Sequence, residues 1–285
     1  MARRKTAREI EKDAAAAARR SRPGTPVSAG EAAAMLARRG LRPRVARQEL
    51  PFPPALQGDA VARLADLLGH YAFRLFFRGA IQKPEGFAAD DATPYVKGAP
   101  ARAFADALVA LGVALPLPGD RYRLARPVSS FGATLEWYVA RELAHRLCFD
   151  AVAGVKFSAR GVGGDLDVVA AAEGKLVYLE VKSSPPKHLS EAEVKAFFDR
   201  LRVLRPDLTL FVMDTALRLG DKVVPMLMTE LARRSGSMSP TPRRIAREVW
   251  ALTPYLYAVN SQPDLMRNIG RAIAEGLTAL APPVP

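Results

Sequence analysis

Residues 163–184, GGDLDVVAAAEGKLVYLEVKSS, constrain the fold more than any other segment of this chain. Two apolar runs, LDVVAAA and KLVYLEV, are separated by Glu173-Gly174. Runs rich in Val, Leu, Ala and Tyr on either side of a short turn are typical of an antiparallel β-hairpin. The segment therefore predicts two adjacent strands whose apolar side chains must be buried.

Charged side chains interrupt these strands near the open end of the hairpin. Because side chains alternate between the two faces of a strand, Asp165 and Asp167 share one face of the first strand, and Glu180 and Lys182 share one face of the second. Carboxylates bind hard cations such as Mg²⁺, which lower the pKa of a bound water and stabilise charge on a reacting phosphate. A neighbouring ammonium group positions the attacking water or neutralises that charge. The pattern favours a metal site beside a phosphodiester.

A simpler interpretation is that these acids are solvated surface groups, since a lone E-x-K occurs by chance in many chains. Two observations favour a functional site. The flanking sequences are apolar, so the acids interrupt strands that are otherwise buried. Lys182 is also followed by Ser183-Ser184-Pro185-Pro186, a break that ends the strand and opens space beside it.

The succession of motifs resembles the PD-(D/E)xK nuclease superfamily, which includes restriction endonucleases and archaeal-type Holliday junction resolvases. The matching residues are Glu136 in FGATLEWYVARELAHRL, Asp167 in GGDLDVV, and Glu180 and Lys182 in YLEVKSS, followed by the expected helix LSEAEVKAFFDRLRVL. The resemblance covers roughly residues 129 to 260. This chain has Leu166-Asp167 where the motif has proline-aspartate, which leaves Asp165 as a competing metal ligand.

The resemblance implies an α/β fold with a restriction-endonuclease-like αβββαβ core and a mixed sheet. It also implies Mg²⁺ or Mn²⁺ as the cofactor, held by Asp167, Glu180 and the backbone carbonyl of Val181. Lys182 would orient or activate the water, and Glu136 would complete the site from the preceding helix. Either Glu136 or Asp165 is a further candidate ligand of the metal. The catalytic set would be Glu136, Asp167, Glu180 and Lys182.

The helix pattern around Glu136 supports its place in the site independently. Glu136, Val139, Leu143 and Leu147 fall on one helical stripe, so the carboxylate that begins this stripe faces the interior and needs a partner there. The alternative is an ordinary first-turn acid that the helix dipole stabilises.

The charge of the chain favours a polyanionic partner. Its formal net charge is +13 and its pI about 10.2. Residues 1–48 hold thirteen Arg and Lys and four acids, so nine of these charges lie there. Such an excess attracts nucleic acid through its field and through counterion release. Because alanine and arginine are abundant throughout, a high-GC coding bias is an alternative source of the arginines.

Three segments are predicted: a basic arm over 1–24, a mainly helical winged-helix-like domain over 25–128, and the nuclease-like domain over 129–285. In the middle segment, residues 59–81 read as one apolar helix, residues 99–111 as a recognition helix, and the stretch around Pro118-Gly119-Asp120 as two short strands of a wing. The winged-helix pattern predicts phosphate contacts from Arg102, Arg121, Arg123 and Arg126. A packing or protein-interaction module is the alternative.

The final third predicts a strand over LTLFVMDT, a helix over VVPMLMTELARR, a polar loop SGSMSPTPRR, one strand near 255–260 and a closing helix. Arg243 and Arg244 of the loop are candidates for phosphate contacts, with solvated surface arginines as the alternative. Trp250, Tyr255 and Tyr257 are candidate base-stacking platforms, although buried core aromatics fit the pattern better.

Other signals narrow the class of protein. Cys148 is the one cysteine, which excludes a disulfide within the chain and a cysteine zinc site, and it is expected to be a buried apolar residue. The three histidines follow no metal-ligand spacing. No apolar run is long enough for a membrane span. A cytoplasmic protein without membrane association is expected, nucleoid-associated when bound to DNA.

Together these features predict a divalent-metal-dependent nuclease that acts on DNA rather than RNA, with the N-terminal domain positioning the substrate. Since one such site cuts one strand, a homodimer is a further expectation. The alternatives are a nuclease fold that binds DNA without hydrolysis, a regulator whose second domain senses a ligand, and a scaffold in a defence or repair complex.

Overall fold

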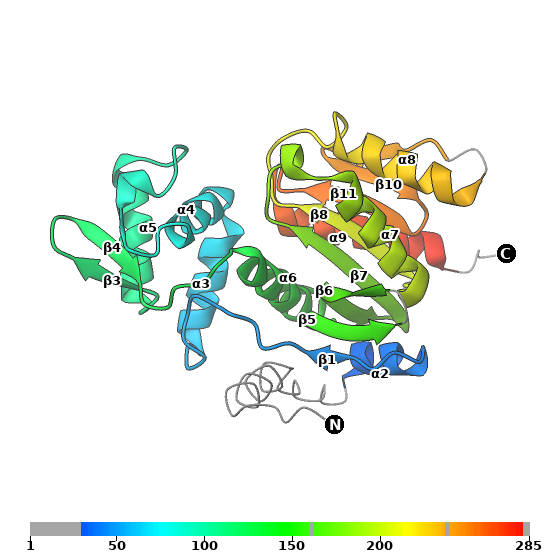
Figure 1. Ribbon diagram of the computed structural model, residues 1–285, viewed down its shortest axis with the longest axis horizontal. Coiled ribbons are helices and arrows are strands. Elements are labelled where there is room, and N and C mark those ends of the chain that lie inside the picture. Colours follow the sequence, from blue (N-terminus) through cyan, green and yellow to red (C-terminus); the bar gives the residue numbers. More distant parts are fainter. Residues whose placement is uncertain (1–29, 160–161, 237–239, 282–285) are drawn as a thin grey trace, which may run out of the picture.

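The computed structural model describes residues 30–159, 162–236 and 240–281 of the chain. It is a mixed α/β protein in which a helical lobe stands beside a larger lobe built on a sheet (Figure 1). The basic arm predicted over 1–24 lies outside the described residues. The helices and strands of the larger lobe are α2 (Glu31–Arg38), β1 (Arg44–Val45), α6 (Gly132–Leu147), β5 (Asp150–Ala159), β6 (Val162–Ala172), β7 (Lys175–Lys182), α7 (Glu191–Leu204), β8 (Leu208–Met213), α8 (Val223–Ser235), β9 (Arg243–Ala246), β10 (Val249–Thr253), β11 (Leu256–Asn260) and α9 (Leu265–Leu280).

Within the described ranges, the large sheet has eight strands in the order β1-β5-β6-β7-β8-β11-β10-β9. The predicted hairpin of β6 and β7 is antiparallel, and its turn residues Glu173 and Gly174 have φ angles of 50° and 69°. Two consecutive positive φ values are the geometry of a type I′ turn, whose twist matches that of the strands. The pairs β7–β8 and β8–β11 are parallel, so the sheet is mixed.

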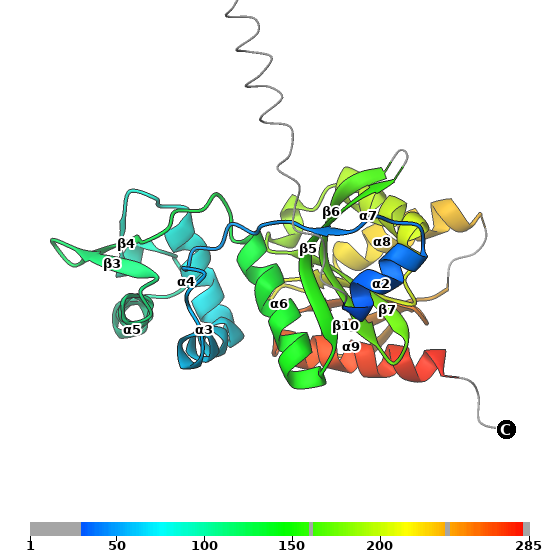
Figure 2. The ribbon, with the colours of Figure 1, turned by 90° about the horizontal axis from the view of Figure 1, so that it is seen from below.

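Helices cover both faces of this sheet (Figure 2). Helices α6 and α9 pack on one face, against a layer that includes Leu179 and Val181 of β7. Helices α2, α7 and α8 pack on the other face, against a layer that includes Tyr178. Strands β7 and β8 are buried on both sides, which is why their sequences are nearly continuous apolar runs.

The helical lobe is built from three helices and a three-stranded sheet in the order β2-β4-β3. These elements are α3 (Asp59–Gly69), α4 (Tyr71–Ile81), β2 (Phe87–Ala88), α5 (Gly98–Ala110), β3 (Ala114–Leu117) and β4 (Arg121–Leu124). The predicted helix near 99–111 and the two strands around Asp120 are present.

Residues 59–81 form two helices, not the one that the sequence predicts. The break is at His70, where ψ is 121° and the backbone is extended. It frees the carbonyl oxygens at the end of α3, and the buried guanidinium of Arg74 donates hydrogen bonds to the carbonyls of Leu68 (2.6 Å) and Gly69 (3.0 Å). Apolar periodicity could not reveal this break because the partner that stabilises it is a tertiary contact.

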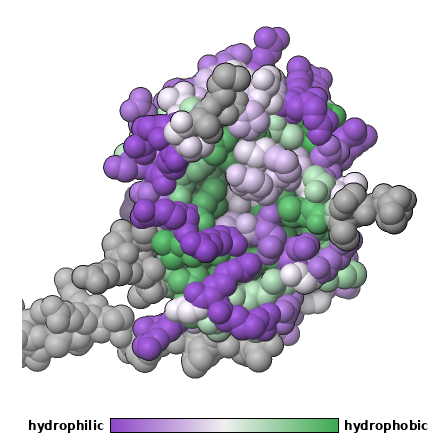
Figure 3. All heavy atoms as spheres, turned by 90° about the vertical axis from the view of Figure 1, so that its right-hand side faces the viewer, coloured by the Kyte–Doolittle hydropathy of each residue, from purple (hydrophilic) through white to green (hydrophobic). Residues whose placement is uncertain are grey.

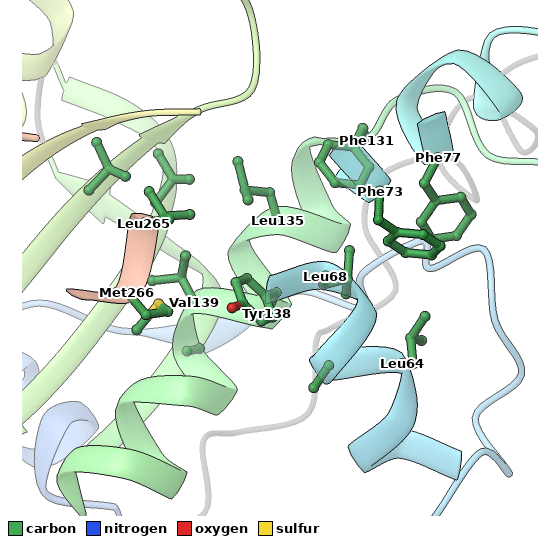
Figure 4. Packing of buried hydrophobic residues seen from close by; sticks show 14 of the residues in the cluster. Leu64, Leu68, Phe73, Phe77, Phe131, Leu135, Tyr138, Val139, Leu265 and Met266 are labelled. Carbon is green, nitrogen blue, oxygen red and sulfur yellow. The ribbon is translucent and has the colours of Figure 1, made fainter. Parts of the chain in front are cut away.

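The two lobes share one hydrophobic core (Figure 4). Leu68 of α3 and Phe77 of α4 belong to the same cluster as Phe131, Leu135 and Val139 at α6, which continues to Leu265 and Met266 at α9. Phe77 and Phe131 meet edge to face, with ring centroids 6.1 Å apart. The helical lobe is therefore packed onto the sheet lobe and not merely tethered to it.

Other expectations require correction. Residues 31–45 were assigned to the helical segment 25–128, but β1 pairs with β5 and α2 packs on the large sheet. The expected polar loop ends in β9. The strand predicted near 255–260 is present as β11, but it pairs with a further strand, β10, that the sequence did not predict. Cys148 is exposed, because it ends α6 in the left-handed conformation with φ 55° and turns outward. Within the described residues, the helices are too short or too polar to cross a membrane.

Candidate active site

The site forms where β6 and β7 separate. Backbone pairing of the two strands ends at Val168 and Leu179, which places Asp167 and Glu180 opposite each other at the next position. The side chain of Asp167 replaces the missing ladder bond, since its Oδ2 accepts a hydrogen bond of 2.7 Å from the backbone N–H of Val181. The N–H and C=O of one strand residue point to the same side. The carbonyl of Val181 therefore faces the side on which Asp167 lies.

Glu180 is the most enclosed acid of the site, with 1 % of its surface exposed. Its Oε1 lies 2.7 Å from Nζ of Lys182 and 2.6 Å from a guanidinium nitrogen of Arg200 on α7. Its Oε2 accepts a hydrogen bond from the hydroxyl of Tyr178, and Arg200 also donates to that hydroxyl (3.2 Å). Both oxygens of Glu180 are thus engaged by protein donors, as a buried carboxylate requires.

The two facing carboxylates differ in their electrostatics. Burial would raise the pKa of Glu180, but Lys182 and Arg200 outweigh it and hold that pKa below its usual value. Burial, together with the charge of Glu180, raises the pKa of Asp167 well above its usual range. Burial lowers the pKa of Lys182, yet Glu180 and Asp167 more than compensate and raise it, so its ammonium stays charged. Lys182 opposes the rise in the pKa of Asp167 but does not offset it.

Glu136 approaches from the first turns of α6. Its Oε2 accepts a hydrogen bond of 3.1 Å from the side chain of Gln48, which follows β1. Burial raises the pKa of Glu136 to about 7, with the hydrogen bond from Gln48 opposing the rise and the charge of Asp165 adding to it. Lys182 and Glu180 also act on this pKa, so Glu136 lies within electrostatic reach of the hairpin acids. The other members of its predicted stripe, Val139 and Leu143, are buried, whereas Leu147 is exposed.

Asp165 differs from Asp167 in its surroundings. Its side chain is 56 % exposed and forms an ion pair of 3.6 Å with the exposed Lys156 of β5. Asp167 contacts β7 directly, while Asp165 is held at the surface by β5. Of the two candidates that the sequence left open, Asp167 is the less exposed and the one that lies against β7.

The donor set suits a hard cation. In the described part of the chain no group of three His, Cys, Asp or Glu side chains stands at ligand geometry. Asp167 nevertheless has one oxygen without a hydrogen bond to the described residues, beside the Val181 carbonyl and opposite Glu180. These are oxygen ligands, which Mg²⁺ and Mn²⁺ prefer. A cation here requires Glu180 to exchange at least one of its present partners.

The arginines predicted to bind nucleic acid lie in several places. On the helical lobe, Arg102 pairs loosely with Asp120 (3.4 Å), and Arg121 donates to the Gly86 carbonyl (3.2 Å). Arg123 is exposed and has no ion pair within the described residues. Three exposed cations therefore lie on or beside the β3–β4 strands.

Arg126 lies nearer the acids. Its guanidinium donates to the carbonyl of Phe52 (3.2 Å). It lines a pocket of about 330 Å³ together with Arg47, Phe52 and Gln48, the residue that contacts Glu136. A basic pocket thus adjoins the Glu136 side of the acid cluster.

Arg243 and Arg244 have different surroundings although they are adjacent. Arg243 pairs with Glu275 of α9. The guanidinium of Arg244 lies over the ring of Trp250, 5.8 Å from its centroid. Of the aromatic candidates, Tyr257 is a core residue with 1 % exposure, whereas Tyr255 is 48 % exposed.

Three residues of the cluster were missed by the sequence analysis: Arg200, Tyr178 and Gln48. A signal existed for Tyr178, because it precedes Glu180 by two residues and therefore shares its strand face. No local signal marks Arg200 or Gln48. Both reach the site from elements that come near it only in the folded chain.

The end of the sheet at which β11 begins is also basic, but Arg234 in its pocket is paired with acids of the protein. Figure 3 faces the end of the molecule at which α8 finishes, where hydrophilic side chains alternate with apolar ones. A pocket of about 590 Å³ between α7 and α8 includes Arg234, Tyr255 and Leu256. Arg234 is engaged there by Glu230 (2.5 Å) and Asp199 (2.9 Å), so its charge is compensated within the protein.

Comparisons with known proteins bear on the fold. No family model and no curated protein matches the chain. Similar solved structures include protein VC1899 from Vibrio cholerae, with a TM-score of 0.51 and 15 % identity, and Can2 from Sulfobacillus thermosulfidooxidans in complex with cyclic tetra-adenylate, with a TM-score of 0.50 and 14 % identity. Each match covers 88 % of this chain and 62 % of the other. The chain therefore spans less than two thirds of either protein, and the likeness concerns the fold.

Proposed function

We propose that this protein is a divalent-metal-dependent nuclease that hydrolyses phosphodiester bonds in DNA. The observation that carries the proposal is the convergence of Asp167, Glu180 and Lys182 where β6 and β7 separate, with Glu136 in reach from α6. One buried acid and two partly buried acids with shifted pKa values, gathered around one lysine, are typical of catalytic sites. The succession α6, β5, β6, β7, α7, β8 supports it, because it follows the αβββαβ order of the PD-(D/E)xK superfamily.

Each residue has a role that follows from its surroundings. Asp167, Glu180 and the Val181 carbonyl would hold Mg²⁺ or Mn²⁺, which when bound supplies an acidified water and stabilises charge on the phosphate. Lys182 stays protonated, so it orients the water and neutralises the transition state and does not act as a base. Glu136, whose pKa is about 7, is suited to accept a proton from the attacking water at neutral pH.

The helical lobe would position the substrate. Its exposed Arg102 and Arg123 provide phosphate contacts, and Arg126 and Arg47 line the pocket that adjoins Glu136. A winged-helix-like arrangement is supported by the helix α5 followed by the β3–β4 hairpin. DNA is proposed over RNA, and a homodimer would place two such sites on the two strands of a duplex.

The experiment incubates purified protein with linear, single-stranded, branched and RNA substrates in Mg²⁺, Mn²⁺ or EDTA. Asp167→Asn and Lys182→Met are expected to lower the cleavage rate by at least about a hundredfold. The matched control is Asp165→Asn, which alters an exposed acid two residues away and should retain activity. Cleavage that persists in both site variants would overturn the proposal.

A second candidate is a nuclease-like fold that binds nucleic acid or a nucleotide without hydrolysis. The observation favouring it is that both oxygens of Glu180 are already paired with protein donors. Because Can2 was solved with cyclic tetra-adenylate, the substrate panel is repeated with that compound present. Tight DNA binding with no metal-dependent cleavage, in its presence or absence, would favour this candidate.

A further inference from the structure

A second basic pocket lies on the sheet lobe, remote from the acid cluster in sequence. It is formed by the loop after β8, by the β9–β10 hairpin and by Gln262 after β11. Its volume is about 560 Å³, which is within the range of small-ligand sites. We call it the arginine pocket, after Arg218, Arg244 and Arg247 in its lining.

The charge of the arginine pocket is only partly compensated. Arg218 and Arg247 are exposed, and neither forms an ion pair with any residue that the structure describes. The pocket also contains Asp221 and Glu248, but the Glu248 carboxylate accepts a hydrogen bond of 2.7 Å from the Leu219 N–H and stands 3.8 Å from Arg244. Among the described lining residues, Arg218 and Arg247 thus face only the one unpaired carboxylate of Asp221, so the pocket keeps an excess of positive charge. Guanidinium groups bind phosphate oxygens in a bidentate manner.

An aromatic surface accompanies these cations. Trp250 lines the pocket beneath Arg244, whose guanidinium is 5.8 Å from the ring centroid. Gly220 lies against the edge of this ring, where a Cβ atom would come within 3.2 Å of it. Arginines together with an indole are the groups that hold phosphates and bases of single strands. Both kinds of group are present in this pocket.

Sheet topology places this pocket at the same end of the strands as the acid cluster, the end at which β7, β8 and β11 finish. Strands β7, β8 and β11 are parallel, with Lys182 opposite Met213 and Met213 opposite Asn260. Strand β10 is antiparallel to β11, so its first residue, Val249, lies opposite Val259 at that end. Three strand spacings separate β7 from β10, which amounts to about 14 Å.

We propose that the arginine pocket binds one nucleotide of the nucleic-acid strand whose cleavage takes place at the Asp167–Glu180–Lys182 cluster. The phosphate contacts Arg218 and Arg247, and the base lies beside Trp250. At a spacing of about 14 Å, the bound nucleotide is about four positions from the cut along a strand that keeps the duplex rise of 3.4 Å per phosphate. This inference rests on the proposed function, because it assigns a second contact to the same substrate.

Binding can be measured without cleavage in the full-length Asp167→Asn protein in EDTA. Trp137→Phe leaves Trp250 as the one tryptophan, so its fluorescence reports on the pocket. The probe is a single-stranded DNA oligonucleotide of about twelve residues, titrated at several salt concentrations. The pocket variant is Arg218→Ala/Arg247→Ala, and the matched control is Arg267→Ala/Arg271→Ala, which removes the same charge from exposed positions on α9.

The pocket variant is expected to bind at least tenfold more weakly and to lower the slope of log affinity against log salt by about 2, while the control retains its affinity. An equal loss in both variants would overturn the proposal, because it would show a general effect of charge. Binding of AMP as tight as that of the oligonucleotide would overturn it as well, since the pocket would then be a site for a free nucleotide.

The two proposals fail separately. If wild-type protein cuts nucleic acid and the pocket variant binds normally, the arginine pocket is refuted and the nuclease stands. If the pocket variant loses oligonucleotide binding and Trp250 responds, while wild-type protein shows no metal-dependent cleavage, the pocket stands as a binding site and the nuclease is refuted.

Discussion

Two buried arginine–carboxylate clusters in this molecule have the same chemistry but differ in how completely their polar groups are hydrogen-bonded within the protein. One joins Arg74 of α4 to Asp214, directly after β8, at a distance of 2.9 Å. The other joins Arg200 of α7 to Glu180 of β7 at 2.6 Å. Both carboxylates have about 1 % of their surface exposed.

We call the Arg74 cluster closed because both oxygens of Asp214 and all three guanidinium nitrogens of Arg74 are engaged, although Nε of the neighbouring Arg78 is buried without a partner among the described residues. Asp214 is bound by Arg74, Arg78 (2.8 Å) and the hydroxyl of Ser261 (2.7 Å), and Arg74 also donates to Ser261 and to the two carbonyls that end α3. The Glu180 cluster adjoins Asp167, which has an unused oxygen, and Glu136, whose pKa is raised to about 7. A closed network holds two lobes together, whereas an open one retains groups that a ligand can engage.

The clusters are also connected. The backbone N–H of Asp214 donates a hydrogen bond of 2.8 Å to the carbonyl of Lys182, in the continuation of the β7–β8 pairing. The residue that anchors the helical lobe is thus the hydrogen-bond neighbour of the candidate catalytic lysine. The packing of the helical lobe therefore supports the backbone at the site.

The largest expected effect on stability comes from a substitution in the closed Arg74 cluster. Arg74→Met leaves a buried carboxylate with one fewer cation, so the free energy of unfolding should fall by about 3–5 kcal/mol in urea denaturation. The double variant Arg74→Met/Asp214→Leu should lose less than the sum of the two single variants, because the uncompensated charge is removed. A loss below about 1 kcal/mol in Arg74→Met would show that the network does not hold the lobes.

The second effect is the pH dependence of the free energy of unfolding that Glu136 contributes. Its folded-state pKa is raised to about 7 from 4.5, so the folded protein binds the proton more tightly than the unfolded chain. Stability from this group is present below pH 4.5 and is lost as pH rises to 7, by about 3 kcal/mol in all. Urea denaturation at pH 5 and pH 8 should show this loss in the wild type and a smaller one in Glu136→Gln. Equal losses of unfolding free energy in the wild type and in Glu136→Gln would show that the pH dependence does not come from Glu136.

The third effect concerns the open cluster. Arg200→Lys retains a positive charge beside Glu180 but cannot reach both Glu180 and the hydroxyl of Tyr178, so a cost of about 1–2 kcal/mol in stability is expected. Arg202→Lys on the exposed side of α7 is the matched control and should be neutral within about 0.5 kcal/mol. If both substitutions were neutral, Arg200 would have no role in holding Glu180.

The smallest effect on stability is expected at an exposed ion pair. Arg102 and Asp120 are 57 % and 78 % exposed, so Arg102→Ala should change the unfolding free energy by about 0.5 kcal/mol or less. If Arg102 contacts a phosphate, the same variant should lower the salt slope of DNA binding by about 1. An unchanged slope would remove Arg102 from the proposed interface.

The elements that the sequence predicted well are those with strong local patterns. The hairpin of β6 and β7, its Glu173-Gly174 turn, the strand β8 and the helices α5, α6, α7, α8 and α9 all formed where apolar runs or helical periodicity indicated them. The elements that were missed depend on partners far away in the chain. The break at His70 relies on Arg74, and β9 exists because Trp250 and Ala251 provide a pairing edge.

The sequence by itself determined that two apolar strands carry Asp167, Glu180 and Lys182 at their open end, because alternation along a strand is a local property. Only the tertiary structure held Asp165 at the surface beside Lys156 and Asp167 against β7, paired Glu180 with Arg200, and tied Asp214 to both Arg74 and the Lys182 backbone. These arrangements are made by burial and by partners 9 to 140 residues away, whose effect on a carboxylate depends on distance and desolvation.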